Sequence, residues 1–184
     1  MLTIYCSGGV RKSTDQDTKL CWGDAERAAL SDALGIAVHF VTPDAPMEDL
    51  SDLSALFGRD IYGVQIADVV VVDARQKRGL GVGIEMAAAK LYGKPLIAVV
   101  PRDSHYRQDD VQIRGGVINE YVHPHIRGLC DEVVGDFEAA GRWLADYLDR
   151  RPRVKGKDAL DTAVSDYMER LHSSDAGMPP SVAA

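Results

Sequence analysis

Short apolar runs recur along the chain and alternate with longer segments whose apolar residues are spaced as on one face of a helix. Apolar runs without polar alternation are typical of strands buried on both faces of a parallel sheet. The runs predict five strands, at residues 2–6, 37–41, 67–73, 95–100 and 131–134. The helical spacing predicts helices at residues 19–34, 53–66, 137–148 and 159–171, and one more that opens within residues 79–85 and continues to 92.

This alternation predicts an α/β fold with a doubly wound, parallel five-stranded sheet and right-handed crossovers. Residues 1–150 form the predicted domain, and residues 151–184 add a C-terminal helix and a flexible tail. The segment 102–127 is polar and rich in Arg, Asp and Gly, so we expect an irregular excursion that serves as a lid or reaches a neighbouring subunit. Functional residues are expected beyond the carboxyl ends of the strands, where ligands of such sheets bind.

The stretch from Gly79 to Glu85 follows the most apolar strand and opens a helix. Bare backbone N–H groups and the positive end of the helix dipole favour an anion at such a place. Gly81 and Gly83 would let a ligand approach the backbone closely. Glu85, expected in the first turn, is therefore a candidate nucleophile or base. A capping glutamate is the other interpretation, and position alone does not separate the two.

Two further residues could work with Glu85. Tyr5 ends the first strand, where its phenol could orient a carboxylate across the crevice. Asp60 lies one helix before the central strand and could protonate or hydrogen-bond a leaving group. A half-buried strand tyrosine and a solvated helix acid are the ordinary alternatives. Two carboxylates and a tyrosine beside a glycine-lined crevice suit cleavage of a glycosidic bond with retention, in which one carboxylate attacks the anomeric carbon.

Glycines and basic residues gather at the same predicted edge. Gly8 and Gly9 break the first strand with a turn where backbone could closely approach a ligand. Basic residues near this turn, near the second glycine stretch and in the excursion are Arg11, Lys12, Arg75, Lys77, Arg78 and Arg114. Arginine suits bidentate recognition of a phosphate. Scattered surface arginines are the common alternative to a phosphate site.

The charge of the chain narrows the class of partner. With a formal net charge of −7 and a pI near 5.2, the chain has no basic excess to grip a nucleic acid polymer. A small molecule is the better partner. Three widely spaced cysteines indicate neither a disulfide framework nor a zinc knuckle, and no apolar run reaches the ~20 residues that span a bilayer. We therefore expect a cytoplasmic protein that does not bind a membrane.

Three common cofactor and metal motifs fit poorly. The dinucleotide fingerprint needs glycine or alanine where Ile84 stands, and a Walker loop is absent from the sequence. The segment His123-Pro124-His125, with Cys130 nearby, lacks a third and fourth ligand at usable spacing, so a loop or packing role is favoured. The sequence thus predicts no metal and no cofactor.

Several motifs occur in the order known from one superfamily. They are Ile-Tyr-Cys-Ser-Gly-Gly-Val-Arg at 4–11, Asp60, the apolar strand at 67–72, Gly-Val-Gly-Ile-Glu at 81–85 and Gly-Lys-Pro at 93–95. Over residues 1–116 the chain resembles the nucleoside 2-deoxyribosyltransferase superfamily, including its 2′-deoxynucleoside 5′-phosphate N-hydrolase branch. The resemblance implies Glu85 as the nucleophile, Asp60 as the catalytic aspartate and Tyr5 as the residue that orients the nucleophile.

The same resemblance implies a flavodoxin-like sheet, a covalent glycosyl-enzyme intermediate, no metal, and a homodimer or larger assembly in which a neighbour completes each site. Serines that help to bind the 5′-phosphate in the hydrolase branch are replaced here by Gly9, by Arg78 or Gly79, and by Asp110. Asp110 from a partner chain would repel a phosphate. It would instead suit sugar hydroxyls, as polar groups of the partner do in the transferase branch.

We therefore expect an enzyme that cleaves the N-glycosidic bond of a nucleoside or nucleoside 5′-monophosphate, with water or a second nucleobase as acceptor. Trp22 or Tyr62 would stack on the base, although a place in a helical core is favoured for Trp22. A non-catalytic nucleotide-binding sensor that signals through residues 151–184 is the alternative from another class. A cytokinin-activating phosphoribohydrolase is disfavoured because its Pro-Gly-Gly-x-Gly-Thr loop is absent from the sequence.

Overall fold

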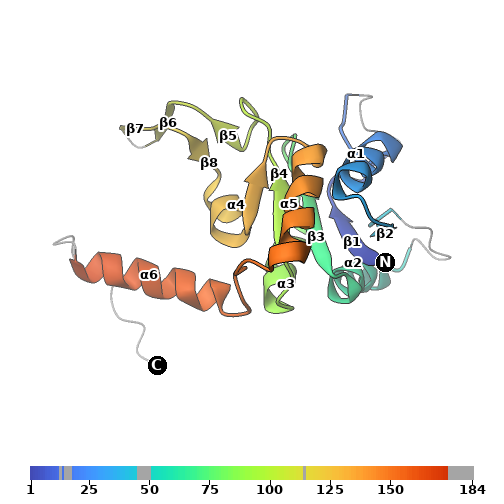
Figure 1. Ribbon diagram of the computed structural model, residues 1–184. Helices are drawn as coiled ribbons and strands as arrows, with labels where there is room; N and C mark the ends of the chain where they lie inside the picture. Colours follow the sequence, from blue (N-terminus) through green and yellow to red (C-terminus); the bar gives the residue numbers. More distant parts are fainter. Residues whose placement is uncertain (13, 15–17, 45–50, 114, 174–184) are drawn as a thin grey trace.

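The computed structural model describes residues 1–12, 14, 18–44, 51–113 and 115–173 (Figure 1). Its centre is a five-stranded, all-parallel sheet in the order β2-β1-β3-β4-β9. The strands are β1 (Leu2–Ser7), β2 (Val38–Val41), β3 (Val69–Asp73), β4 (Leu96–Val99) and β9 (Glu132–Val134). This order and the flanking helices confirm the predicted doubly wound α/β fold of the flavodoxin-like type.

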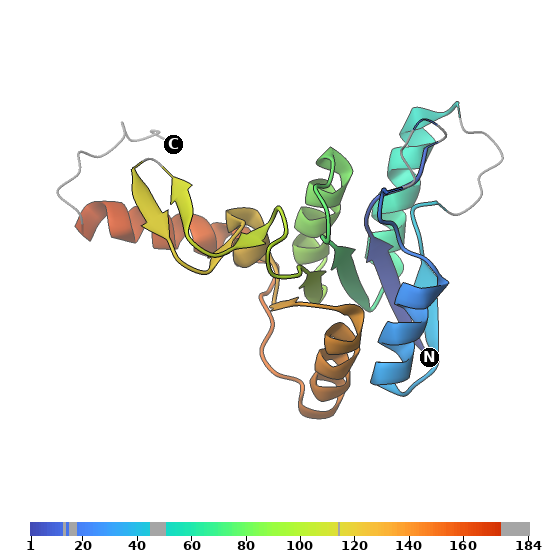
Figure 2. The same cartoon turned by 90° about the horizontal axis from the view of Figure 1, so that it is seen from above.

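Helices cover both faces of the sheet, as Figure 2 shows from above. One face carries α1 (Asp24–Leu34) and α5 (Phe137–Arg150). The other face carries α2 (Leu53–Ile66), α3 (Leu80–Leu91) and α4 (Pro124–Leu129). Every residue of β3 is buried because a helix layer packs on each side of it. Alternate residues of β1 and β3 therefore enter two separate hydrophobic cores.

The first helix begins later than predicted. The sequence pattern predicts a start at residue 19, whereas α1 starts at Asp24. Gly23 is the N-cap residue, and its backbone N–H donates to the carboxylate of Glu26 at 3.0 Å, so a local capping interaction sets the start. The predicted stop at Gly35 is confirmed by its left-handed backbone, with φ of 75°.

The helix that carries Glu85 begins inside the predicted stretch 79–85, but too early to place Glu85 in its first turn. α3 starts at Leu80, so Gly81 and Gly83 lie inside the helix and Glu85 lies in its second turn instead of its first. The backbone N–H two residues before the helix donates to the hydroxyl of Tyr106 at 2.7 Å. This contact joins segments that are distant in the sequence, and no local pattern reveals it. The expectation of an acid in the first turn is thus wrong.

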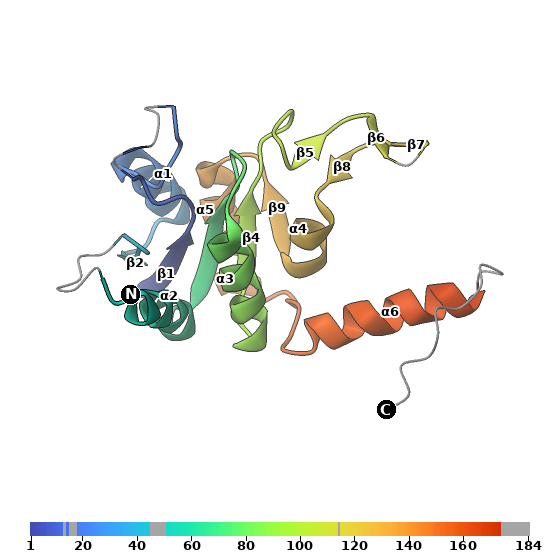
Figure 3. The ribbon, with the colours of Figure 1, turned by 180° about the vertical axis from the view of Figure 1, so that it is seen from behind.

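The excursion at residues 102–127, predicted to be irregular, contains two small antiparallel sheets. β5 (Arg107–Gln108) pairs with β8 (Tyr121–Val122), and β6 (Val111–Ile113) pairs with β7 (Gly116–Ile118). Strands this short show no recognisable alternation in a sequence. We call residues 107–122 the arm. The arm projects beyond the edge strand β9, on the same side of the molecule as α6 (Ala159–Ser173), as Figure 3 shows from behind.

The C-terminal region agrees with the sequence as far as the structure describes it. The predicted helix at 159–171 is present as α6. The predicted tail lies almost wholly outside the described residues. No helix in the described part of the chain is both long and apolar enough to cross a membrane.

Candidate active site

β1 and β3 lie side by side in the sheet, and the chain leaves them toward opposite edges. From β1 the chain continues to β2 on one side, and from β3 it continues to β4 on the other. Crevices at such a reversal are the usual ligand sites of doubly wound sheets. Tyr5 and Ser7 are two positions apart on β1, so both face the helix layer that contains α3.

Glu85 is the centre of a cluster of polar side chains at this place. Only 5% of the residue is exposed. The Tyr5 hydroxyl donates to Oε1 at 3.1 Å, and the Ser7 hydroxyl donates a short hydrogen bond to Oε2. Each carboxylate oxygen thus has its own hydroxyl donor, which orients the carboxylate. The alternative of a capping glutamate is not observed, because Glu85 lies in the second turn and its oxygens bind these hydroxyls.

Burial raises the pKa of the Glu85 carboxyl from 4.5 to about 7. The hydrogen bonds from Ser7 and Tyr5 lower this pKa, and the negative charge of Asp60 raises it, but burial has the largest effect. Near neutral pH the carboxyl therefore exchanges between its acid and carboxylate forms. A poorly hydrated carboxylate loses little water when it attacks an electrophilic carbon.

Tyr5 is positioned by a glycine of α2. The residue is 1% exposed, and burial followed by the charges of Glu85 and Asp60 raises the pKa of its hydroxyl, so the hydroxyl stays protonated and donates. A Cβ built on Gly63 would lie 2.7 Å from Cε2 of Tyr5. Gly63 therefore makes the space that the tyrosine ring occupies.

Gly63→Ala is expected to destabilise the protein by about 1–3 kcal/mol, because a methyl group would displace the Tyr5 ring in a packed core. Gly58→Ala on the same helix is the matched control, since nothing lies within 4 Å of a Cβ at that position. The control should gain about 0.5–1 kcal/mol from the higher helix propensity of alanine. Urea denaturation followed by circular dichroism measures both changes. Equal effects at the two positions would contradict the role assigned to Gly63.

Ser7 is the site residue that sequence reasoning missed. The pattern treats it as part of the glycine turn, whereas it is the last residue of β1 and is fully buried. The indole N–H of Trp22 donates to the Ser7 carbonyl at 2.9 Å and so helps to hold the strand end. Trp22 precedes α1 but is buried, edge-to-face with Phe137 at a centroid distance of 4.6 Å. The two-residue spacing from Tyr5 on a predicted strand is the signal that could have found Ser7.

Asp60 lies on α2 close to the same cluster. Its charge acts on both Tyr5 and Glu85, so the structure brings together the three residues predicted to be catalytic. The Asp60 side chain is 29% exposed and pairs with Arg59, whose Nη2 lies 2.9 Å from Oδ1. Arg59 also donates to the carbonyl of Pro43, which ties this ion pair to the segment after β2.

Arg78 belongs to the scaffold beneath the crevice. Only 4% of its side chain is exposed, and its Nη2 lies 2.7 Å from Oδ2 of the fully buried Asp73. Its other guanidinium nitrogens donate to backbone carbonyls. A Cβ on Gly9 would lie 2.7 Å from Nη1 of Arg78, and a Cβ on Gly8 would lie 2.9 Å from Cδ1 of Trp22. A side chain at Gly8 would displace the buried Trp22 ring, and one at Gly9 would displace the end of the Arg78 side chain.

The glycines around the start of α3 are not crowded by neighbouring atoms. Nothing lies within 4 Å of a Cβ built on Gly79, Gly81 or Gly83. Gly79 is the N-cap, and among the described residues no side chain caps the helix, so its first N–H groups are open to a ligand. Arg11 is exposed and donates to the carbonyl of Lys19 at 2.9 Å. At this end of α3 the backbone can therefore be approached closely.

Three residues predicted to contact substrate are not seen in the Glu85 cluster. Asp110 is exposed on the arm between β5 and β6, with a left-handed φ of 57°. Arg114 lies outside the described residues. Tyr62 on α2 is 59% exposed.

The side chains gathered here are a buried carboxylate held by two hydroxyl donors and a second carboxylate nearby. Within the part of the chain that the structure describes, no three His, Cys, Asp or Glu side chains are arranged to hold a metal ion. No family model matches this chain, and no curated protein is significantly similar to it.

Proposed function

We propose that this protein cleaves the N-glycosidic bond of a nucleoside or nucleoside 5′-monophosphate through a covalent glycosyl-glutamate intermediate. The observation that carries the proposal is the buried Glu85 carboxylate with one hydroxyl donor on each oxygen. Asp60 supplies the second carboxyl group that such a reaction uses. The ordered motifs shared with the nucleoside 2-deoxyribosyltransferase superfamily support the same chemistry.

In the first step, a Glu85 oxygen forms a bond to the anomeric carbon. The bond from that carbon to the base nitrogen breaks, and its electron pair leaves with the base. Asp60, in its acid form, gives its proton to the departing base. In the second step, water or a second nucleobase attacks the anomeric carbon, Glu85 leaves as a carboxylate, and the acceptor's proton returns to Asp60. Water as acceptor makes the protein a hydrolase, and a second base makes it a transferase.

The substrate's sugar or phosphate would lie at the open end of α3. Arg11 and the uncapped N–H groups at the start of the helix are its proposed partners, because both favour an anion. The assembly we propose is a homodimer or larger homo-oligomer. In it the projecting arm carries Asp110 to a neighbouring subunit, where its carboxylate would accept hydrogen bonds from sugar hydroxyls.

The rate of base release should rise with pH through about 7, because only the ionised form of Glu85 can attack. Ser7→Ala removes a hydrogen bond that lowers the Glu85 pKa, so the midpoint of this rise should move to higher pH. The pH dependence of kcat/KM measures the midpoint in the free enzyme. Ser54→Ala, at an exposed position of α2, is the matched control. An unchanged midpoint in Ser7→Ala would contradict the assignment of Glu85 as the group that must ionise.

The direct test is base release from a panel of ribo- and deoxyribonucleosides and their 5′-monophosphates, with and without a second free base. Chromatography separates the products, and Glu85→Ala is run beside the unmodified protein. Release that disappears in Glu85→Ala supports the proposal, and exchange with the added base identifies a transferase. Binding without turnover across the panel would instead support a nucleotide-binding sensor.

A further inference from the structure

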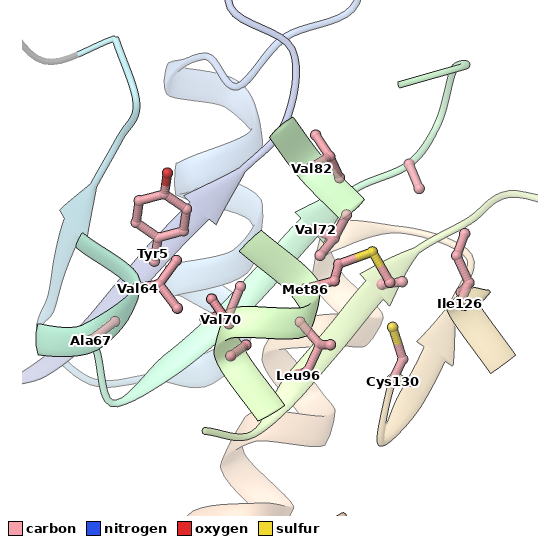
Figure 4. Packing of buried hydrophobic residues seen from close by; sticks show 14 of the residues in the cluster. Tyr5, Val64, Ala67, Val70, Val72, Val82, Met86, Leu96, Ile126 and Cys130 are labelled. Atoms are coloured by element: carbon pink, nitrogen blue, oxygen red, sulfur yellow. The ribbon is translucent and has the colours of Figure 1, made fainter. Parts of the chain in front are cut away.

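A cavity lies on the other side of α3 from Glu85. It has a volume of about 370 Å³ and is lined by residues of α3, of α4 and of the segments before and after the arm. Figure 4 places Tyr5 on the α2 side of α3 and Ile126, which lines the cavity, on the α4 side. Glu85 and Ser7 are not among its described lining residues. Gly79 and Gly83 are, so the cavity adjoins the start of α3, where the substrate's sugar or phosphate is proposed to lie. The volume falls within the range of small-molecule sites, about 300–1,000 Å³.

The wall of this cavity is a run of aromatic rings in edge-to-face contact. The ring of Tyr106 lies 4.8 Å from that of His105 and 5.4 Å from that of His123, between centroids. His123 in turn lies 5.2 Å from His125. Such rings offer faces and edges to a planar aromatic molecule. The floor is apolar and includes Val72, Val82, Met86 and Ile126 (Figure 4).

The described residues of the lining include positive groups and no negative ones. Lys77 and Arg78 line the cavity together with the three histidines, and no described Asp or Glu does so. This is notable in a chain with 28 acidic residues and a net charge of −7. Arg78 is already paired with Asp73 at 2.7 Å, so the exposed Lys77 is the cation left for a ligand. An anion is therefore favoured over a cation in this cavity.

The wall is ordered before any ligand arrives. The Tyr106 hydroxyl accepts the backbone N–H of Arg78 at 2.7 Å, and the backbone N–H of His123 donates to the Tyr106 carbonyl at 2.8 Å. Burial, followed by the nearby His125 and His105, lowers the pKa of His123. The ring is therefore neutral at physiological pH, where it can stack or donate one hydrogen bond. A site ordered in advance costs a ligand less entropy on binding.

We propose that this cavity is a binding site for a small planar aromatic anion. The ring of the ligand lies between the apolar floor and the aromatic wall, and its negative group faces Lys77 and the imidazole N–H groups.

The test uses three probes on the full chain: orotate, which has a pyrimidine ring and a carboxylate; uracil, which has the ring alone; and inorganic phosphate, which has charge alone. Proton NMR of the imidazole C2–H signals reports binding, because three of the five histidines line the cavity. Orotate should shift the signals of His105, His123 and His125 saturably. Its dissociation constant should be at least about tenfold lower than that of either other probe. Equal binding of uracil or phosphate at these signals, or no saturable shift, would overturn the proposal.

Substitutions in the lining separate this site from the Glu85 crevice. Lys77→Met and His125→Ala change exposed residues of the lining, and each should weaken orotate binding by about fivefold or more. Lys157→Met, an exposed lysine elsewhere, should leave the affinity unchanged. Glu85→Gln should also bind orotate normally. Because binding is read without turnover, a failure of the glycosidic-cleavage proposal would leave this result standing, and loss of binding in Glu85→Gln would overturn the separate site.

Discussion

Glu85→Gln is expected to abolish base release, by a factor on the order of 10³ or more, while leaving the fold intact. An amide of the same shape fits between the Tyr5 and Ser7 hydroxyls, but its oxygen is too weak a nucleophile to form the glycosyl ester. Base release measured by chromatography on the best substrate of the panel gives the loss. Glu138→Gln, at an exposed position on α5, is the matched control and should retain full activity.

The same variant should be more stable than the unmodified protein, and increasingly so as pH rises. The Glu85 pKa is about 7 in the folded protein against an ordinary value of 4.5, so between these values the folded state binds more protons than the unfolded state. The stability of the unmodified protein therefore falls as pH rises through this window, by about 3 kcal/mol from this residue. Glutamine does not titrate in this range, so residue 85 of the variant causes no such loss of stability as pH rises.

Urea denaturation below and above this window measures the effect. The stability difference between Glu85→Gln and the unmodified protein should widen by about 3 kcal/mol from about pH 4 to about pH 8. For Glu138→Gln, whose side chain is 66% exposed in the unmodified protein, the difference should not change with pH. A difference for Glu85→Gln that stays constant with pH would show that Glu85 is not buried as an ionisable group.

Lys90→Met is expected to have the largest effect on stability, a loss of about 3–5 kcal/mol. Lys90 is fully buried at the end of α3, and its ammonium lies 2.6 Å from the carboxylate of Asp131, which is 3% exposed. Removing the lysine leaves a buried carboxylate without its counter-charge. That carboxylate also accepts the backbone N–H groups of Leu96 and Lys155, each at 2.7 Å, so it cannot simply turn to solvent.

Thermal and urea unfolding of Lys90→Met test this expectation. Arg142→Met is the matched control, because it breaks an exposed ion pair with Glu138 at 3.5 Å and should cost less than about 1 kcal/mol. The double variant Lys90→Met/Asp131→Leu should regain only part of the loss, since the backbone N–H groups held by Asp131 would lose their acceptor. A loss in Lys90→Met no larger than in Arg142→Met would contradict a buried pair at this place.

The central fold was readable from the sequence, because runs such as the four valines before Asp73 carry an unambiguous pattern. All five strands of the parallel sheet were predicted, and the helix at 53–66 was predicted with both ends correct. The errors fall at helix starts and in the arm. α1 begins where Glu26 caps Gly23, and the chain before α3 is held by a distant tyrosine. Boundaries set by single hydrogen bonds leave no periodic signal.

The candidate site, too, was predicted only in part from the sequence. Glu85, Asp60 and Tyr5 were predicted because each has a motif position and chemistry that suit a glycosidic bond, and the structure brings them together. Ser7 was missed because its role depends on the register of β1 against α3. Arg78 was predicted as a phosphate contact, but the structure places it with Asp73 in the scaffold. Whether an arginine pairs with a carboxylate of the protein depends on tertiary contacts that the sequence pattern does not show.

The sequence by itself determined the sheet, its helix layers and the edge at which polar side chains would meet, because burial on both faces demands apolar runs without polar alternation and polar residues are left for the loops. Tertiary structure alone decided which hydroxyls hold Glu85, that its pKa rises, why Gly63 must lack a side chain, and that a cavity opens on the far side of α3. Those properties depend on distances between residues far apart in the chain, and the desolvation of a carboxylate is defined only once its neighbours have excluded water.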